Sequence, residues 1–155
     1  MRIVRAAFLM LACVPPPAAT PTSQLSPAAQ VAEQQRLWRA ARISDYAFTY
    51  QDQCFCVGSF VWVRITVSNG KVINAELTDT TSYRFHRTSE FRRPTIDSLF
   101  AYVADAYARN SERVEVRYNS TFHFPTHAML DWKLNVIDDE FSFDVRDFTA
   151  GPSKR

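Results

Sequence analysis

The sequence predicts an α+β fold, with a largely antiparallel sheet of five to six strands and two helices packed on one face. Three observations predict it. The chain has 155 residues, 46% hydrophobic and 22% charged, which suits one globular domain with a real core. Two segments place apolar residues at helical spacing, and six alternate as half-buried strands do. These segments follow in the order α-βββ-α-βββ, which an antiparallel sheet with helices on one face accommodates.

The first half contains the first helix and three strands. Ser26 is expected to cap the helix and Pro27 to occupy its first position. Trp38 is expected to anchor this helix to the core. Asn69-Gly70 predicts a tight hairpin between the second and third strands, because both central residues of such a turn need positive φ. The side chains expected to face the core from the strands are Tyr46, Phe48 and Tyr50, then Val61, Val63, Ile65 and Val67, then Ile73, Ala75 and Leu77.

The second half repeats this order after a polar, basic loop over residues 80–93. Thr95 is expected to cap the second helix, and Asn110 to end it. Residues 149–155 are predicted to be a disordered tail, so the domain is expected to span 27–148. The core-facing strand residues are expected to be Val114, Val116 and Tyr118, then Ala128, Leu130, Trp132 and Leu134, then Phe141, Phe143 and Val145.

The two halves are offset by about 68 residues, which would fit a duplicated α-βββ unit. Residue identity between the halves is low, so coincidence is the alternative explanation.

The N-terminus is typical of an export signal. Residues 1–12 carry Arg2 and Arg5 and then a short apolar run, which falls well below the roughly 20 residues that span a bilayer. Residues 13–26 are rich in Pro, Ala, Thr and Ser, and are predicted to be a flexible tether. Cys13, after a small residue, is expected to be lipidated, which would anchor the protein to a membrane. A cleaved secretory signal and a misassigned start codon are the alternatives.

Charge and motifs exclude several functions. The chain has 18 Lys and Arg against 16 Asp and Glu, and without Arg2 and Arg5 the two signs balance, so no nucleic-acid partner is expected. There is no Gly-x-Ser-x-Gly, phosphate-binding glycine loop or His-Glu-x-x-His motif. We therefore expect no cofactor and lean against an enzyme, although an active site assembled from distant residues stays open.

Cys54 and Cys56 are the most specific feature of the sequence. If Cys13 is lipidated or removed, these two remain, as expected for a disulfide in an oxidising compartment. Alternate strand residues lie about 6.5–7 Å apart at Cα, so a bridge needs a local bend, which Gly58 and Ser59 make plausible. So short a ring gives about 1.6 kcal/mol of chain-entropy stabilisation. Two free buried thiols, and a redox or metal role, are the alternatives.

Three further groups of residues have the chemistry of a possible site. The histidines His86, His123 and His127 lack zinc-site spacing, so no metal site is expected. Asp138-Asp139-Glu140 is interpreted as a solvated hairpin turn in preference to a cation site. The basic, aromatic loop is the best candidate for partner contact, because rigid scaffolds present functional residues on loops. Its candidate residues are Tyr83, Arg84, His86, Arg87, Arg92 and Arg93.

Several short motifs occur along the chain in a fixed order: Trp38 and Tyr46 leading into Cys54-Phe55-Cys56, then residues 67–72, Thr95-Ile96, Leu99-Phe100, residues 114–119, Pro125-Thr126 and Asp138-Asp139-Glu140. Through these motifs the chain, from about Leu37 to Phe148, resembles a family of secreted or lipid-anchored bacterial proteins of unknown function. The chain departs from the family at His123-Phe124, where the family tends to have Gly-Tyr, and at Asn119, where it tends to have Asp. The resemblance implies an exported α+β domain and no known reaction.

The sequence therefore favours an exported protein of the periplasm or outer cell surface. We expect a non-catalytic binding or interaction module for an envelope protein or ligand. The alternative function is a thiol-redox or metal-handling envelope protein that uses Cys54 and Cys56, and a third is an unrecognised hydrolase.

Overall fold

The structure, a computed structural model, describes residues 25–56, 58–78 and 92–151. Two helices, α1 (Pro27–Ala40) and α2 (Ile96–Ala108), alternate with two groups of three strands, which confirms the predicted order. The strands are β1 (Tyr46–Gln53), β2 (Val63–Ser68), β3 (Lys71–Leu77), β4 (Arg113–Tyr118), β5 (Pro125–Asp131) and β6 (Phe141–Ala150).

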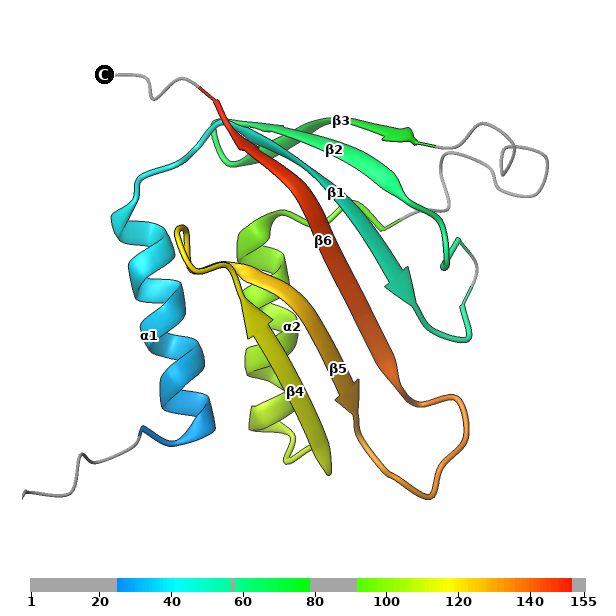
Figure 1. Ribbon diagram of the computed structural model, residues 1–155. Coiled ribbons are helices and arrows are strands. Elements are labelled where there is room, and N and C mark those ends of the chain that lie inside the picture. The colour runs from blue at the N-terminus through cyan, green and yellow to red at the C-terminus, as the bar shows by residue number, and fades with distance from the viewer. Residues whose placement is uncertain (1–24, 57, 79–91, 152–155) are drawn as a thin grey trace, which may run out of the picture.

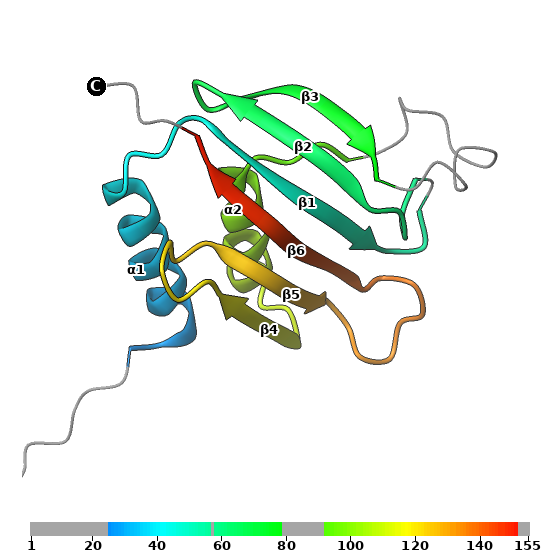
Figure 2. The ribbon, with the colours of Figure 1, turned by 45° about the horizontal axis from the view of Figure 1, so that its top comes forward.

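The six strands form one sheet in the order β3-β2-β1-β6-β5-β4, and every neighbouring pair is antiparallel (Figure 1). Both helices cover the same face (Figure 2). Helix α2 packs on β4 and β5, and α1 packs against α2. Trp38 of α1 is buried and meets the rings of Tyr46, Phe124 and Phe148 edge-on, so it anchors the helix as predicted.

Local side-chain hydrogen bonds set the predicted helix ends. Ser26 Oγ accepts a hydrogen bond from Ala29 N at 3.3 Å, with Pro27 in the first turn. Thr95 Oγ1 accepts from Ser98 N at 3.2 Å, and Ser98 Oγ accepts from Thr95 N at 3.4 Å. Asn110, just past α2, has a φ of 57°, the conformation that ends a helix.

The hairpin between β2 and β3 is confirmed. Ser68 pairs with Lys71, and the two residues between them have φ values of 48° at Asn69 and 72° at Gly70. This is the conformation for which Asn-Gly is favoured. The predicted core-facing residues of the second strand are all buried: Val61, Val63, Ile65 and Val67.

The prediction for Ile73 is wrong. The pairing of β2 with β3 shifts by one residue, so Val67 pairs with Val72, Thr66 pairs with Asn74, and Ile73 has no partner of its own. This β-bulge turns Ile73 outward, where its side chain is 65% exposed. Val72 packs on the core in its place.

The predicted ends of the last two strands are also corrected. β5 ends at Asp131, so Leu134 is not core-facing but lies in the following loop, 63% exposed. β6 continues through Thr149 and Ala150, two residues beyond the predicted end of the domain.

The last strand, β6, contains a bulge near its end, and several contacts hold the residues around it. Asp147 takes a φ of 53°, and the pairing with β1 shifts there, so Phe148 turns toward the aromatic core. Arg64 Nη1 reaches across β1 and donates to the carbonyl oxygen of Asp147 at 2.6 Å. Gly151 N donates to Asp45 O at 2.7 Å, which ties down the end of the strand.

The two halves are not superimposable units. Following the antiparallel pairs from β1 through β6 and β5 shows that β4 runs opposite to β1. If a translation related the two halves, β1 and β4 would run in the same direction, which they do not. If a rotation related them, reversing the strand directions while keeping the order of strands across the sheet, the two helices would lie on opposite faces. Both helices lie on one face, so the sequence offset does not reflect a congruent structural repeat.

Several predictions concern residues outside the described ranges. These are the signal over residues 1–12, the lipidation of Cys13, most of the tether, and the loop residues Tyr83, Arg84, His86 and Arg87. Within the described ranges, neither helix has the length and apolar character needed to cross a bilayer.

Candidate functional site

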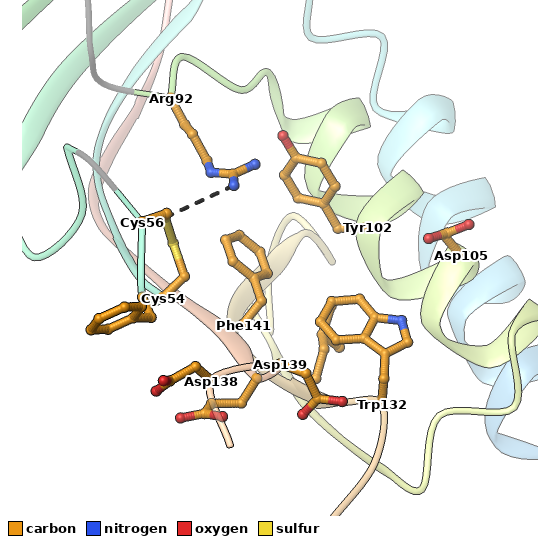
Figure 3. Close-up of a pocket in the computed structure, with 12 residues that line it drawn as sticks. Cys54, Cys56, Arg92, Tyr102, Asp105, Trp132, Asp138, Asp139 and Phe141 are labelled. Carbon is orange, nitrogen blue, oxygen red and sulfur yellow. Dashed lines mark hydrogen bonds between the residues drawn. A yellow bond between two sulfur atoms is a disulfide. The ribbon is translucent and has the colours of Figure 1, made fainter. Parts of the chain in front are cut away.

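A pocket of about 280 Å³ lies at one end of the sheet, where β1 and β5 end and β6 begins. Four segments form it: the loop after β1, the segment before α2, α2 itself, and the loop between β5 and β6 (Figure 3). Its lining residues are Cys54, Phe55, Cys56, Arg92, Tyr102, Asp105, Leu130, Trp132, Asp138, Asp139, Glu140 and Phe141.

Cys54 and Cys56 form a disulfide at the wall of this pocket. Their Cα atoms lie 5.3 Å apart, closer than on a straight strand, because the chain bends there as predicted. Ser59 Oγ lies within hydrogen-bonding distance of the carbonyl oxygens of both cysteines, at 3.0 Å and 2.9 Å. Cys54 packs against the core, whereas Cys56 is exposed.

Arg92 connects this disulfide to the core. Its Nε lies 3.1 Å from Asp52 Oδ2 in an ion pair, and its Nη2 donates to Cys56 Sγ at 4.0 Å. Its guanidinium carbon lies 5.1 Å from the centre of the Phe141 ring. The sequence singled out Arg92 as a contact for a partner. In the structure it is a pocket residue held by three contacts, and its neighbour Arg93 is exposed.

Asp52 is the buried acid of the site, and the sequence reasoning missed it. It is 3% exposed and continues the inward-facing alternation of Tyr46, Phe48 and Tyr50. That alternation was a usable signal, since extending it by two residues places Asp52 on the core side. Burial raises the pKa of Asp52 above 3.8, and the charge of Arg92 opposes this rise. Burial also raises the pKa of the neighbouring Tyr50.

The acidic turn is part of the pocket and not only a solvated connection. Asp138, Asp139 and Glu140 line one wall, and Asp105 of α2 adds a fourth carboxylate. Asp105 is paired with Arg109 at 2.9 Å. Trp132, predicted to continue a strand, lies just beyond β5 and lines the pocket with its ring.

Exposed apolar side chains surround the pocket in the same two loops. Phe55, between the cysteines, is 85% exposed, and Ile137, before the acidic turn, is 87% exposed. Phe60, Leu134 and Val136 are also exposed in these loops. The pocket therefore opens onto a surface with both apolar and acidic groups.

The described histidines lie outside this pocket. His127 Nδ1 is 2.9 Å from Asp144 Oδ1 on the open face of the sheet, and His123 Nδ1 is 3.1 Å from Gln34 Oε1 of α1. Over residues 25–56, 58–78 and 92–151, no three His, Cys, Asp or Glu side chains come together as a metal site would require.

Asn119 and His123, where the chain departs from the family pattern, shape a turn between β4 and β5. Asn119 Oδ1 accepts hydrogen bonds from Thr121 N at 2.9 Å and Phe122 N at 2.8 Å. A carboxylate could accept the same bonds, so the exchange of Asp for Asn preserves the turn. His123 has a φ of 66°, a conformation that glycine adopts most readily, which fits the glycine that the resemblance implies at this position.

Together, the fold and the pocket define a single-sheet α+β protein with a disulfide-lined pocket at the end of its sheet. The chain belongs to a family of unknown function, DUF6174, which matches residues 30–150. This confirms the resemblance inferred from the sequence. No match was found among curated proteins or among solved structures.

Proposed function

We propose that the protein is an exported cell-envelope protein that acts as a non-catalytic binding module, and that the pocket beside Cys54 and Cys56 is its binding site. The observation that carries this proposal is the pocket itself, with its aromatic lining and its border of exposed apolar side chains. Concave apolar sites with a few polar groups are where proteins usually bind small ligands or peptide side chains.

The exposed apolar residues support a partner at this position. Single exposed apolar side chains are ordinary on a protein surface. Here, however, Phe55 and Ile137 are almost fully exposed, in the two loops that also form the pocket. Covering them would add apolar burial to the contacts inside the pocket, at about 25 cal/mol per Å².

The charges favour a ligand with a cationic group on an apolar body, such as a Lys or Arg side chain in a peptide. Four carboxylates line the pocket, against one guanidinium, and one of the four, Asp105, is itself paired with Arg109. That guanidinium, of Arg92, is already paired with Asp52. A cation entering the pocket would meet the carboxylates and the faces of Tyr102 and Trp132.

Two features support a location in the cell envelope. Residues 1–12 have the pattern of an export signal, and the paired Cys54 and Cys56 are typical of an oxidising compartment. Lipidation of Cys13, followed by the Pro- and Ser-containing tether, would hold the domain near a membrane surface with its pocket free to meet a partner.

In vivo photo-crosslinking tests the proposal. A photoreactive residue in place of Phe55 is expected to give a discrete adduct in the host, whereas one in place of Ile73, exposed on a distant strand, should give none. Trp132→Ala, in the Phe55-labelled chain, should abolish the adduct while leaving the protein folded. Equal labelling from both positions, or no adduct from Phe55, would contradict the proposal.

A charge reversal tests the ligand class. Glu140→Lys is expected to reduce the Phe55 adduct several-fold, because it puts a cation beside the pocket. Glu76→Lys on β3 makes the same change away from the pocket and should leave the adduct unchanged. An adduct that increases with Glu140→Lys would indicate an anionic ligand instead.

A further inference from the structure

We infer that the Cys54–Cys56 disulfide is a thiol–disulfide exchange site, which oxidises a pair of thiols in a peptide substrate. This inference goes beyond binding, because the disulfide would exchange with whatever dithiol segment reaches the pocket. It depends on three features of the site: the unequal exposure of the two sulfurs, the small structural need for the bridge, and the cation beside Cys56.

The two cysteines differ in their access to solvent. Cys54 packs against the core, whereas Cys56 is exposed where the pocket opens. A substrate thiolate can therefore approach Cys56 Sγ more readily than Cys54 Sγ, because Cys54 is half-buried. Such unequal access to the two sulfurs directs exchange toward one of them.

The disulfide contributes little to the stability of the fold. It joins residues only two apart in sequence, and so short a loop gives little chain-entropy stabilisation. Other contacts already hold the same bend, since Ser59 bonds to the carbonyl groups of both cysteines. Phe60 N also donates to Asp52 O at 2.8 Å, which closes the loop around them. The bridge can therefore open without releasing the strand.

Arg92 provides the cation that thiol chemistry requires. Its Nη2 lies 4.0 Å from Cys56 Sγ, and a guanidinium remains charged at every physiological pH. Asp52 on one side and the Phe141 ring on the other hold it in place. A fixed positive charge favours the thiolate form of Cys56, which makes this sulfur a good leaving group.

The exchange takes two steps. In the first step, a substrate thiolate attacks Cys56 Sγ and forms a new S–S bond with it. The Cys54–Cys56 bond breaks, its electron pair passes to Cys54 Sγ, and Cys54 takes up a proton. The second substrate thiolate then attacks the substrate sulfur of this mixed disulfide and releases Cys56 as a thiolate beside Arg92. The substrate dithiol is oxidised to a disulfide, and the protein disulfide is reduced to a dithiol.

The exchange can be tested with the full chain carrying Cys13→Ser, so that no third thiol interferes. The probe is a synthetic peptide with two cysteines flanked by Leu and Arg, which suit the apolar and acidic pocket. Acid quenching, alkylation and mass spectrometry should show the peptide oxidised and both protein cysteines reduced, in equal amounts. A Cys54→Ser chain has no Cys54–Cys56 disulfide to exchange, so it should leave the peptide reduced.

The role of Arg92 is measured in the Cys54→Ser chain, from the rate at which iodoacetamide alkylates Cys56 at pH 7. Arg92→Gln is expected to slow this reaction roughly 3- to 10-fold, because a tenfold loss of thiolate is one pKa unit. Arg92→Lys should retain most of the rate. Arg113→Gln removes an equally exposed arginine away from the pocket and should change nothing.

Two results would overturn the inference: a disulfide that stays intact in excess peptide, or an effect of Arg92→Gln no larger than that of Arg113→Gln. Either result could accompany a Phe55 adduct, in which case the binding module stands and its disulfide is only structural. Peptide oxidation without any Phe55 adduct would support exchange and contradict the binding module.

Discussion

Asp52 links the core of the sheet to the pocket, because its carboxylate is buried on the inner face of β1 while its partner Arg92 reaches the surface. Two charged or titratable groups act on it, Tyr50 on the same strand and Arg92, and Tyr102 of α2 acts in turn on Tyr50. The ion pair does not fully offset the loss of hydration, so the pKa of Asp52 stays above its ordinary value of 3.8.

This shift predicts how stability depends on pH. Between the unfolded and the folded pKa of Asp52, the folded protein binds more protons than the unfolded chain, so stability contributed by this group falls as pH rises from about 4. Asp52→Asn should remove that fall and leave the protein relatively more stable at pH 7. Urea unfolding at several pH values checks this, and parallel pH profiles for both chains would refute it.

His123 is a second residue whose position makes a prediction. A φ of 66° costs a residue with a side chain about 1–2 kcal/mol, and glycine avoids this cost. Part of that gain is lost, because glycine has more conformational freedom in the unfolded chain. His123→Gly should therefore stabilise the protein by roughly 0.5–1 kcal/mol. His127→Gly, the same substitution in an extended strand, should instead destabilise it by about 1 kcal/mol. Thermal unfolding of both variants gives the comparison.

At the scale of elements, the β3 bulge separates two adjacent apolar residues with opposite environments. Val72 packs on the core, and Ile73 points to solvent. Val72→Ala should therefore cost about 1 kcal/mol of unfolding free energy, and Ile73→Ala less than about 0.5 kcal/mol. Chemical denaturation measures both. A larger loss at Ile73 would mean that the register of β3 is the one predicted from simple alternation.

The helices and strands show which structural features can be predicted from the sequence and which cannot. Helix caps at Ser26 and Thr95 and the Asn69-Gly70 turn depend on residues within one turn of each other, so they were predicted correctly. The bulges at Ile73 and Asp147 depend on the partner strand, and no local pattern marks them. The bulge in β3 turns Ile73 itself outward, while Ala75 and Leu77 keep the predicted face, and the bulge in β6 brings Phe148 against the core.

The pocket was only partly predictable for the same reason. The sequence singled out Cys54, Cys56, Arg92 and the acidic turn as separate candidates. Their meeting depends on β1 lying beside β6, two strands separated by most of the domain. Single-sequence patterns contain no such long-range information, so the site emerged only from the fold.

At the scale of the whole molecule, the proposed anchor makes a prediction. If Cys13 carries a lipid, wild-type protein should sediment with membranes, and Cys13→Ser should move most of it to the soluble fraction. Fractionation of host cells followed by immunoblotting checks this. The Cys56→Ser variant is the matched control and should stay with the membranes. An unchanged distribution for Cys13→Ser would rule out the lipid anchor.

The central position of β6 has a consequence for how the chain matures. β6 is the last strand to be synthesised, yet it lies between β1 and β5 and joins the two three-stranded groups. Until it emerges, β1 has an unpaired edge and the pocket lacks the wall that contains Phe141. A ribosome that stops before residue 141 therefore releases a chain without its central strand, which quality-control proteases should recognise as unfolded.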